Sequence, residues 1–194
     1  MKKIRLAVLI SGRGSNMEAL INACADPDYP AIVAVVISNR PDAAGLEKAK
    51  AAGIATEIVD HKNFTGRPAF EAALQETLLK HTPVDLVCLA GFMRILTPGF
   101  VDQWQDHIIN IHPSLLPDYK GLDTYARALA DGKTEAGCTV HYVVPEMDDG
   151  PIIVQKRVPV LAGDTPDTLA ARILAEEHGA YTEAVRLVAG RILG

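Results

Sequence analysis

Two polar side chains stand one residue apart within a short apolar run. The run extends from Ile108 to His112 and contains Asn110 and His112. Residues two apart on a β-strand project to the same face, so an amide donor and a titratable imidazole can reach one target. At the C-terminal end of a parallel strand, such a pair is suited to stabilising a developing oxyanion. The spacing favours acyl or formyl transfer, and the alternative is a histidine that only satisfies neighbouring backbone groups.

A second group of polar residues lies in the acidic segment Glu146 to Pro151, which includes Asp148, Asp149 and Gly150. Its composition predicts a solvated turn between two strands without any function. The alternative is a rigid turn that holds one carboxylate near His112, where it would orient the imidazole and favour its protonated form.

A glycine-rich segment, Ser11-Gly12-Arg13-Gly14-Ser15-Asn16, separates an apolar run from a helical pattern. Backbone N–H groups and the helix dipole favour an anion at such a position. Met17 occupies the last glycine position of the dinucleotide pattern, and Ser38-Asn39 stand where an acidic ribose ligand is expected, so NAD is disfavoured. A Gly-Lys-Ser/Thr sequence is absent. A phosphate-monoester site remains, with an ordinary tight turn as the alternative.

Histidine and cysteine do not form a recognisable metal motif. His107 and His141 offer a metal alternative around His112, but the positions of His107 and His112 differ by an odd number on an extended run, and no clustered carboxylate joins them. We therefore expect no metal. The three cysteines are far apart, without C-x-x-C spacing, and are expected to be buried reduced thiols: Cys24, Cys88 and Cys138.

The elements that must position these residues follow an α/β order, because short apolar runs alternate with helical patterns. The capping-box spacing from Ser15 to Glu18 predicts a helix start after the glycine-rich segment. Further helices are expected over 43–52, 68–80 and 125–130, from Thr97-Pro98 and from Thr165-Pro166. Parallel strands are expected over 4–10, 32–38, 56–60, 85–89 and 108–112, and an antiparallel pair over 139–144 and 152–160. The prediction is a single-domain, Rossmann-like three-layer sandwich with a mostly parallel sheet and an antiparallel C-terminal edge.

Length and composition agree with one domain over residues 1–194. The chain has 194 residues, of which 48% are hydrophobic, and a net charge of −5. This charge lacks the basic excess of a nucleic-acid-binding protein. The apolar run after Met1-Lys2-Lys3 is interrupted by Arg5 and ends too early for a signal peptide, and no run is long enough to span a bilayer. We expect a soluble cytoplasmic protein that binds neither nucleic acid nor membranes.

Together, these segments resemble the phosphoribosylglycinamide formyltransferases, a family of folate-dependent enzymes. The resemblance extends over nearly the whole chain and is carried in order by residues 11–16, 89–96, 110–117 and 148–151. It implies that Asn110, His112 and Asp148 are catalytic, that 10-formyltetrahydrofolate is the donor co-substrate, and that the amine of a glycinamide ribotide is the acceptor in purine biosynthesis.

The resemblance also implies binding residues. The ribotide would contact Gly14, Ser15 and Asn16 through its phosphate and Glu177 through its ribose. The folate would contact the residues Arg67, Met93, Arg94, Ile95, Leu96, Asn110, Val144 and Asp148. Accordingly, the N-terminal half, residues 1–95 or so, is expected to bind the phosphate. The C-terminal half, residues 96–194 or so, is expected to bind the folate and to carry the catalytic groups. Two positions depart from the family pattern: Leu174 replaces a polar residue and Arg13 replaces asparagine or another small polar residue.

Other interpretations use the same motifs. Formyltetrahydrofolate hydrolase and other N-formyltransferases resemble the chain in the Asn-x-His and Asp segments, but we expect no room for their additional domains. A non-enzymatic nucleotide-binding module would leave Asn110, His112 and Asp148 unused. In the expected mechanism the amine attacks the formyl carbon, Asn110 and protonated His112 stabilise the oxyanion, and a proton reaches the folate through His112 or a water. Small-molecule substrates and a monomer or weak homodimer are expected.

Overall fold

A computed structural model describes residues 2–194 and contains a seven-stranded sheet of order β3-β2-β1-β4-β5-β6-β7. The strands β1 to β5 pair in parallel, and β6 and β7 are antiparallel to their neighbours. The expected mostly parallel sheet with an antiparallel C-terminal edge is confirmed. The strands are β1 (Ile4–Ile10), β2 (Ala31–Ser38), β3 (Thr56–Ile58), β4 (Leu86–Leu89), β5 (Ile108–His112), β6 (Glu135–Tyr142) and β7 (Ile152–Pro159).

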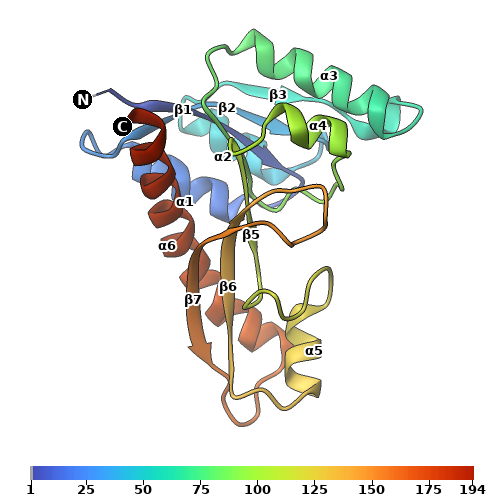
Figure 1. Cartoon of the computed structure of the whole chain (residues 1–194), viewed down its shortest axis with the longest axis vertical. Helices are drawn as coiled ribbons and strands as arrows, with labels where there is room; N and C mark the ends of the chain where they lie inside the picture. The colour runs from blue at the N-terminus through green and yellow to red at the C-terminus, as the bar shows by residue number, and fades with distance from the viewer. Residues whose placement is uncertain (1) are drawn as a thin grey trace.

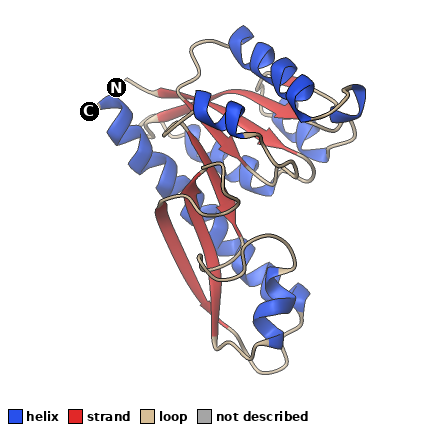
Figure 2. Ribbon diagram, turned by 45° about the vertical axis from the view of Figure 1, so that its right-hand side comes forward, coloured by secondary structure: helices blue, strands red, loops and turns tan. Residues whose placement is uncertain are grey.

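Helices cover both faces of the sheet, which gives the expected three layers (Figure 2). They are α1 (Ser15–Cys24), α2 (Ala44–Ala51), η1 (His61–Asn63), α3 (Arg67–Lys80), α4 (Pro98–Gln103), α5 (Thr124–Ala130) and α6 (Pro166–Leu193). Helix α6 is the longest. It runs from the neighbourhood of α5 to the end of the molecule where the N-terminus lies (Figure 1).

The alternation of buried side chains along β1 explains the two cores. Leu6 and Val8 pack in one cluster with residues of α1, α2 and α6, whereas Ala7 and Leu9 pack in the other cluster with residues of α3 and α4. Both faces of β1 are therefore buried, as is typical of a central parallel strand. None of the helices within residues 2–194 combines the length and the apolar character needed to cross a bilayer.

The capping box predicted from Ser15 to Glu18 is wrong. Gly14 is the N-cap residue, with a left-handed φ of 70°, and no side chain caps the helix. Glu18 instead accepts from Lys48 Nζ at 2.7 Å. A side chain at Gly14 would bring its Cβ to 2.9 Å from Gly45 Cα, so both the backbone conformation and the close approach require glycine.

Several strand boundaries differ from the prediction, most of all those of β3 and β6. β3 ends at Ile58 rather than at residue 60, because Asp60 caps η1 by accepting from Lys62 N. β6 begins at Glu135 rather than at residue 139. Its first residues, Glu135, Ala136 and Gly137, have low β-propensity, and their pairing with β7 determines the conformation instead.

Candidate functional site

The site begins at β5, the last strand of the parallel set. Asn110 and His112 lie on this strand, between parallel β4 and antiparallel β6. In the β6 register, Asn110 is opposite His141 and His112 is opposite Thr139. The switch from parallel to antiparallel pairing therefore brings a polar side chain of β6 next to the predicted pair.

The His112 ring lies between two acceptors. Its Nε2 is 2.9 Å from Tyr119 O, and since a carbonyl oxygen only accepts, Nε2 carries the hydrogen. Its Nδ1 is 3.5 Å from Asp148 Oδ2, and the side chains of His112 and Asp148 are only 7% and 12% exposed. A hydrogen on Nδ1 would point toward this carboxylate, so Asp148 is placed to orient the imidazole.

Asp148 is fixed by the turn between β6 and β7. Its backbone is left-handed, with a φ of 52°, and its Oδ2 accepts from Gly121 N at 2.9 Å. A Cβ at Gly150 would collide with the carbonyl oxygen of Tyr142, so the turn packs tightly against the end of β6. The neighbouring Asp149 is exposed and pairs with Lys120. Of the two interpretations of the acidic segment, the one with a carboxylate held near His112 matches the geometry.

His141 is a member of this cluster that the sequence reasoning considered only as a metal ligand. Its Nδ1 donates to Tyr142 O at 2.8 Å, which leaves Nε2 as an acceptor 3.4 Å from Asn110 Nδ2. Burial, the largest effect, lowers the pKa of His141 and so favours the neutral ring, while Tyr142 O and the Asp148 carboxylate, 3.7 Å from Nε2, raise it. A neutral Nε2 orients the Asn110 amide with its NH2 group toward β6. The strand register was the missing signal, because it alone places Asn110 opposite His141.

The metal alternative receives no geometric support. His107 lies at the opposite end of β5 and its Nδ1 donates to Asp85 O at 2.7 Å. Within residues 2–194, no three His, Cys, Asp or Glu side chains form a group that could hold a metal ion.

The glycine-rich segment between β1 and α1 borders a cavity of about 490 Å³. Gly14, Ser15 and Asn16 line this cavity together with Met93 and Arg94 of the segment after β4. Two segments that the sequence reasoning assigned to different ligands thus share one cavity. A buried hydroxyl connects them: Ser11 Oγ accepts from Met93 N at 2.8 Å and donates to Asn39 Oδ1.

Asn16 and Glu177, which the resemblance assigns to the ribotide, contact each other. Asn16 Nδ2 donates to Glu177 Oε2 at 2.6 Å, and both side chains are buried. Asn16 Oδ1 is buried without a hydrogen-bond partner. Burial raises the pKa of Glu177, while the hydrogen bond from Asn16 and the charges of His178 and His112 lower it. The electrostatic effect of His112 connects this acidic group to the β5 cluster.

The residues assigned to the folate are more dispersed. Met93 and Ile95 are mostly exposed, and Val144 is partly exposed. Leu96 is buried in the core on the α3 side of the sheet, so its side chain packs internally and only its backbone can serve a ligand. Arg67 is exposed at the start of α3 and lines neither of the two cavities described for this structure.

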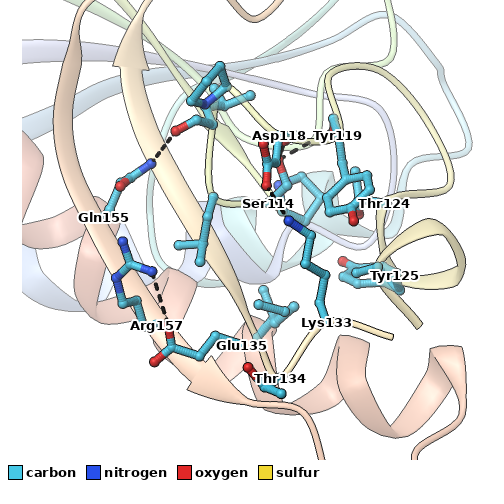
Figure 3. A pocket seen from close by; sticks show the side chains of 17 residues that line it. Ser114, Asp118, Tyr119, Thr124, Tyr125, Lys133, Thr134, Glu135, Gln155 and Arg157 are labelled. Atoms are coloured by element: carbon cyan, nitrogen blue, oxygen red, sulfur yellow. Dashed lines mark hydrogen bonds and ion pairs between the residues drawn. The ribbon is translucent and has the colours of Figure 1, made fainter. Parts of the chain in front are cut away.

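A second cavity of about 330 Å³ lies beneath the segment that follows β5 (Figure 3). Ser114, Asp118 and Tyr119 line it from this segment, and Ser114 Oγ donates to Asp118 O at 2.6 Å. None of the site residues predicted from the sequence lines this cavity. This cavity relates to the candidate site only through the segment that lines it, because Tyr119 O of that segment accepts a hydrogen bond from His112 Nε2.

Comparisons with known proteins agree with this description. A family model described as formyl transferase matches residues 4–185. The phosphoribosylglycinamide formyltransferase of Escherichia coli is 47% identical over 92% of this chain and 84% of its own length. The trifunctional purine biosynthetic protein adenosine-3 of Homo sapiens is 48% identical over 97% of this chain, which spans only 18% of that relative.

Solved structures show the same fold. Glycinamide ribonucleotide transformylase 1 from Symbiobacterium toebii superimposes with a TM-score of 0.94 at 50% identity, covering 97% of this chain and 89% of the other. Phosphoribosylglycinamide formyltransferase from Brucella melitensis gives a TM-score of 0.92 at 48% identity, covering 97% and 96%. The seven-stranded sheet, parallel from β3 to β5 with helices on both faces, places the chain in the α/β class. The chain belongs to the formyl transferase family.

Proposed function

We propose that this protein transfers the formyl group of 10-formyltetrahydrofolate to the amine of 5'-phosphoribosylglycinamide, giving formylglycinamide ribotide in purine biosynthesis. The names of the relatives support this reaction, and the family supports a formyl donor. The observation that carries the proposal is the approach of Asp148 Oδ2 to within 3.5 Å of His112 Nδ1, next to Asn110 on the same strand.

Asn110 and His112 would stabilise the oxyanion that forms when the amine attacks the formyl carbon. His141 occupies one hydrogen of the Asn110 amide, and the second remains for the oxyanion. The Nε2–H group of His112 would leave its hydrogen bond to Tyr119 O and donate to the oxyanion instead. Asp148 would stabilise the positive imidazole throughout and hold its orientation.

The ribotide would bind along the cavity beside α1. Its phosphate fits the free N–H groups at the start of this helix, next to Gly14, Ser15 and Asn16. Glu177 would accept a hydrogen bond from the ribose, since its carboxylate is buried beside Asn16. The amine of the ribotide would then extend toward the cluster on β5.

The folate would lie on the other side of that cluster, against apolar and backbone groups. Exposed side chains of Met93, Ile95 and Met147 offer apolar surface for an aromatic ring system. We assign Arg94, Val144 and the backbone of Leu96 to the same ligand, and exposed Arg67 to its acidic tail. The chain would act in the cytoplasm on these small molecules as a monomer or weak homodimer.

A formyl-transfer assay tests the proposal. Purified protein is incubated with 10-formyltetrahydrofolate, with and without the ribotide, and both products are followed by mass spectrometry. We expect formylglycinamide ribotide and tetrahydrofolate in equal amounts, with no turnover when the ribotide is omitted. Formate release at the same rate without the ribotide would identify a hydrolase and reject the proposal.

A further inference from the structure

Arg13 is a cationic side chain at the cavity that none of the assigned roles uses. It lies between Gly12 and Gly14 in the segment that leads into α1, and it lines the cavity of about 490 Å³. The side chain is exposed. Its guanidinium forms no hydrogen bond or ion pair within residues 2–194. An unpaired guanidinium at the rim of a cavity keeps its full capacity to bind an anion.

The other arginines of this cavity are placed differently. Arg40 is held by Asp42 through two hydrogen bonds, of 3.0 Å from Nε and 2.7 Å from Nη2, so its charge is locally balanced. Arg94 lies in the segment after β4, on the side assigned to the folate, and its Nε is buried without a partner. Arg13 is therefore the cavity arginine that adjoins the start of α1 with its charge uncompensated.

The charge of Arg13 also acts on α5. Burial and the Glu177 carboxylate raise the pKa of Tyr125 to about 12, and the Arg13 charge opposes this rise. Arg13 therefore lies near enough to α5 to influence Tyr125.

Asn16 provides a separate indication that this part of the cavity receives a ligand. It is only 8% exposed, it lines the cavity, and its Oδ1 has no hydrogen-bond partner. A buried acceptor without a partner is costly, and a ligand hydroxyl would remove that cost. A hydroxyl acceptor at Asn16 and an uncompensated cation at Arg13, which line the same cavity, suit the two ends of a ribose phosphate.

We propose that Arg13 is a side-chain anchor for the phosphate of the substrate, forming an ion pair with the dianion that the N–H groups of α1 also hold. Arg13 thereby determines the preference for a phosphorylated ribotide over the corresponding riboside. This inference rests on the proposed function for its substrate, but the recognition of a ribose phosphate is testable without turnover.

The kinetic test compares Arg13→Gln and Arg13→Lys with the wild type. An ion pair present in both the ground state and the transition state affects KM more than kcat. We expect Arg13→Gln to raise KM for the ribotide by about tenfold or more, the usual effect of losing a hydrogen bond to a charged group. We expect kcat to be nearly unchanged, and Arg13→Lys to recover part of the loss because it keeps the charge.

Two comparisons make the result specific. Lys48→Gln is the matched control, because Lys48 pairs with Glu18 on the helix surface and its loss changes the net charge equally. It should leave KM unchanged. For the dephosphorylated riboside, kcat/KM should be the same in Arg13→Gln and wild type. Equal losses for ribotide and riboside, or an unchanged KM in Arg13→Gln, would overturn the assignment of Arg13.

A binding measurement separates this inference from the proposed reaction. Ribose 5-phosphate and inorganic phosphate are titrated into the wild type, Arg13→Gln and Lys48→Gln by calorimetry. We expect about tenfold weaker binding of ribose 5-phosphate to Arg13→Gln only. If the wild type failed to formylate the ribotide but this difference persisted, the phosphate anchor would stand and the reaction would be wrong. Equal affinities in all three proteins would reject the anchor.

Discussion

His112 and Asp148 should act as one unit, and a double-mutant cycle measures their coupling. The variants are His112→Ala, Asp148→Asn and the double mutant. In the structure, His112 Nδ1 lies 3.5 Å from Asp148 Oδ2, with both side chains largely buried. Without the imidazole, a carboxylate that orients and stabilises it has little left to act on. Each substitution should therefore lower kcat much less when the other partner has already been replaced.

The separation of the two groups gives the size of this effect. Opposite unit charges at this distance attract by about 5 kcal/mol at an effective dielectric constant near 20. Partial exposure of Asp148 and the desolvation of both groups reduce this figure, and contacting pairs usually couple by about 0.5–3 kcal/mol. We expect coupling near the upper end, about 2–3 kcal/mol, so that the double mutant retains roughly 30- to 150-fold more activity than the product of the single losses predicts.

The assay is kcat at saturating concentrations of both substrates, with thermal melting to confirm that each variant folds. Asp149→Asn is the matched control, because Asp149 is adjacent in sequence but pairs with Lys120 at the surface. It should lower kcat little. Strictly multiplicative losses for His112 and Asp148, or an effect of Asp149→Asn as large as that of Asp148→Asn, would refute the reasoning.

Three further predictions concern single positions. Asn110→Ala should lower kcat by about 10²–10³, the usual loss of one oxyanion donor, and turnover near that of the wild type would remove Asn110 from the mechanism. Gly14→Ala should lower the free energy of unfolding by about 1–3 kcal/mol in urea titrations, because it forces a side chain into a left-handed φ; an unchanged midpoint would contradict this. Burial raises the pKa of Glu177 in the folded protein above its value in the unfolded chain. The ionised carboxylate therefore destabilises the fold above the folded-state pKa, and this destabilisation disappears below the unfolded-state pKa. Glu177→Gln should therefore raise Tm at pH 7.5, and the gain should shrink as pH falls toward 4; a gain independent of pH would show that the cause is not the charge.

The sequence predicted the parts of the site that depend on local geometry. Asn110 and His112 share a face because alternation along a strand is fixed, and the α/β order of the elements predicted that β5 is a parallel strand. The approach of Asp148 was only one of two interpretations, because it depends on a left-handed turn and on the Gly121 N–H group, which lies 27 residues away. Neither feature has a periodic signal.

Errors arose where tertiary contacts override local pattern. The Ser15 to Glu18 spacing suits a capping box, but the close packing of Gly14 against Gly45 starts the helix differently. His141 was overlooked as a partner of Asn110 because an antiparallel register cannot be deduced from two strands that are considered separately. The motif could not show that the Leu96 side chain is buried in the core on the α3 side, so that its assignment to the folate rests on its backbone alone.

The Ser11 hydroxyl has a thermodynamic consequence for the two ligands. It connects the segment before α1 to Met93 N, so a ligand that immobilises one segment also restricts the other. The first ligand to bind therefore bears most of the conformational-entropy cost of ordering both segments. The second ligand bears less of this cost and binds more tightly. Linkage requires this enhancement to be reciprocal: the ribotide should strengthen folate binding by the same factor as the folate strengthens ribotide binding. Ser11→Ala removes the connection while keeping a small side chain at the cavity, and it should bring that shared factor toward one.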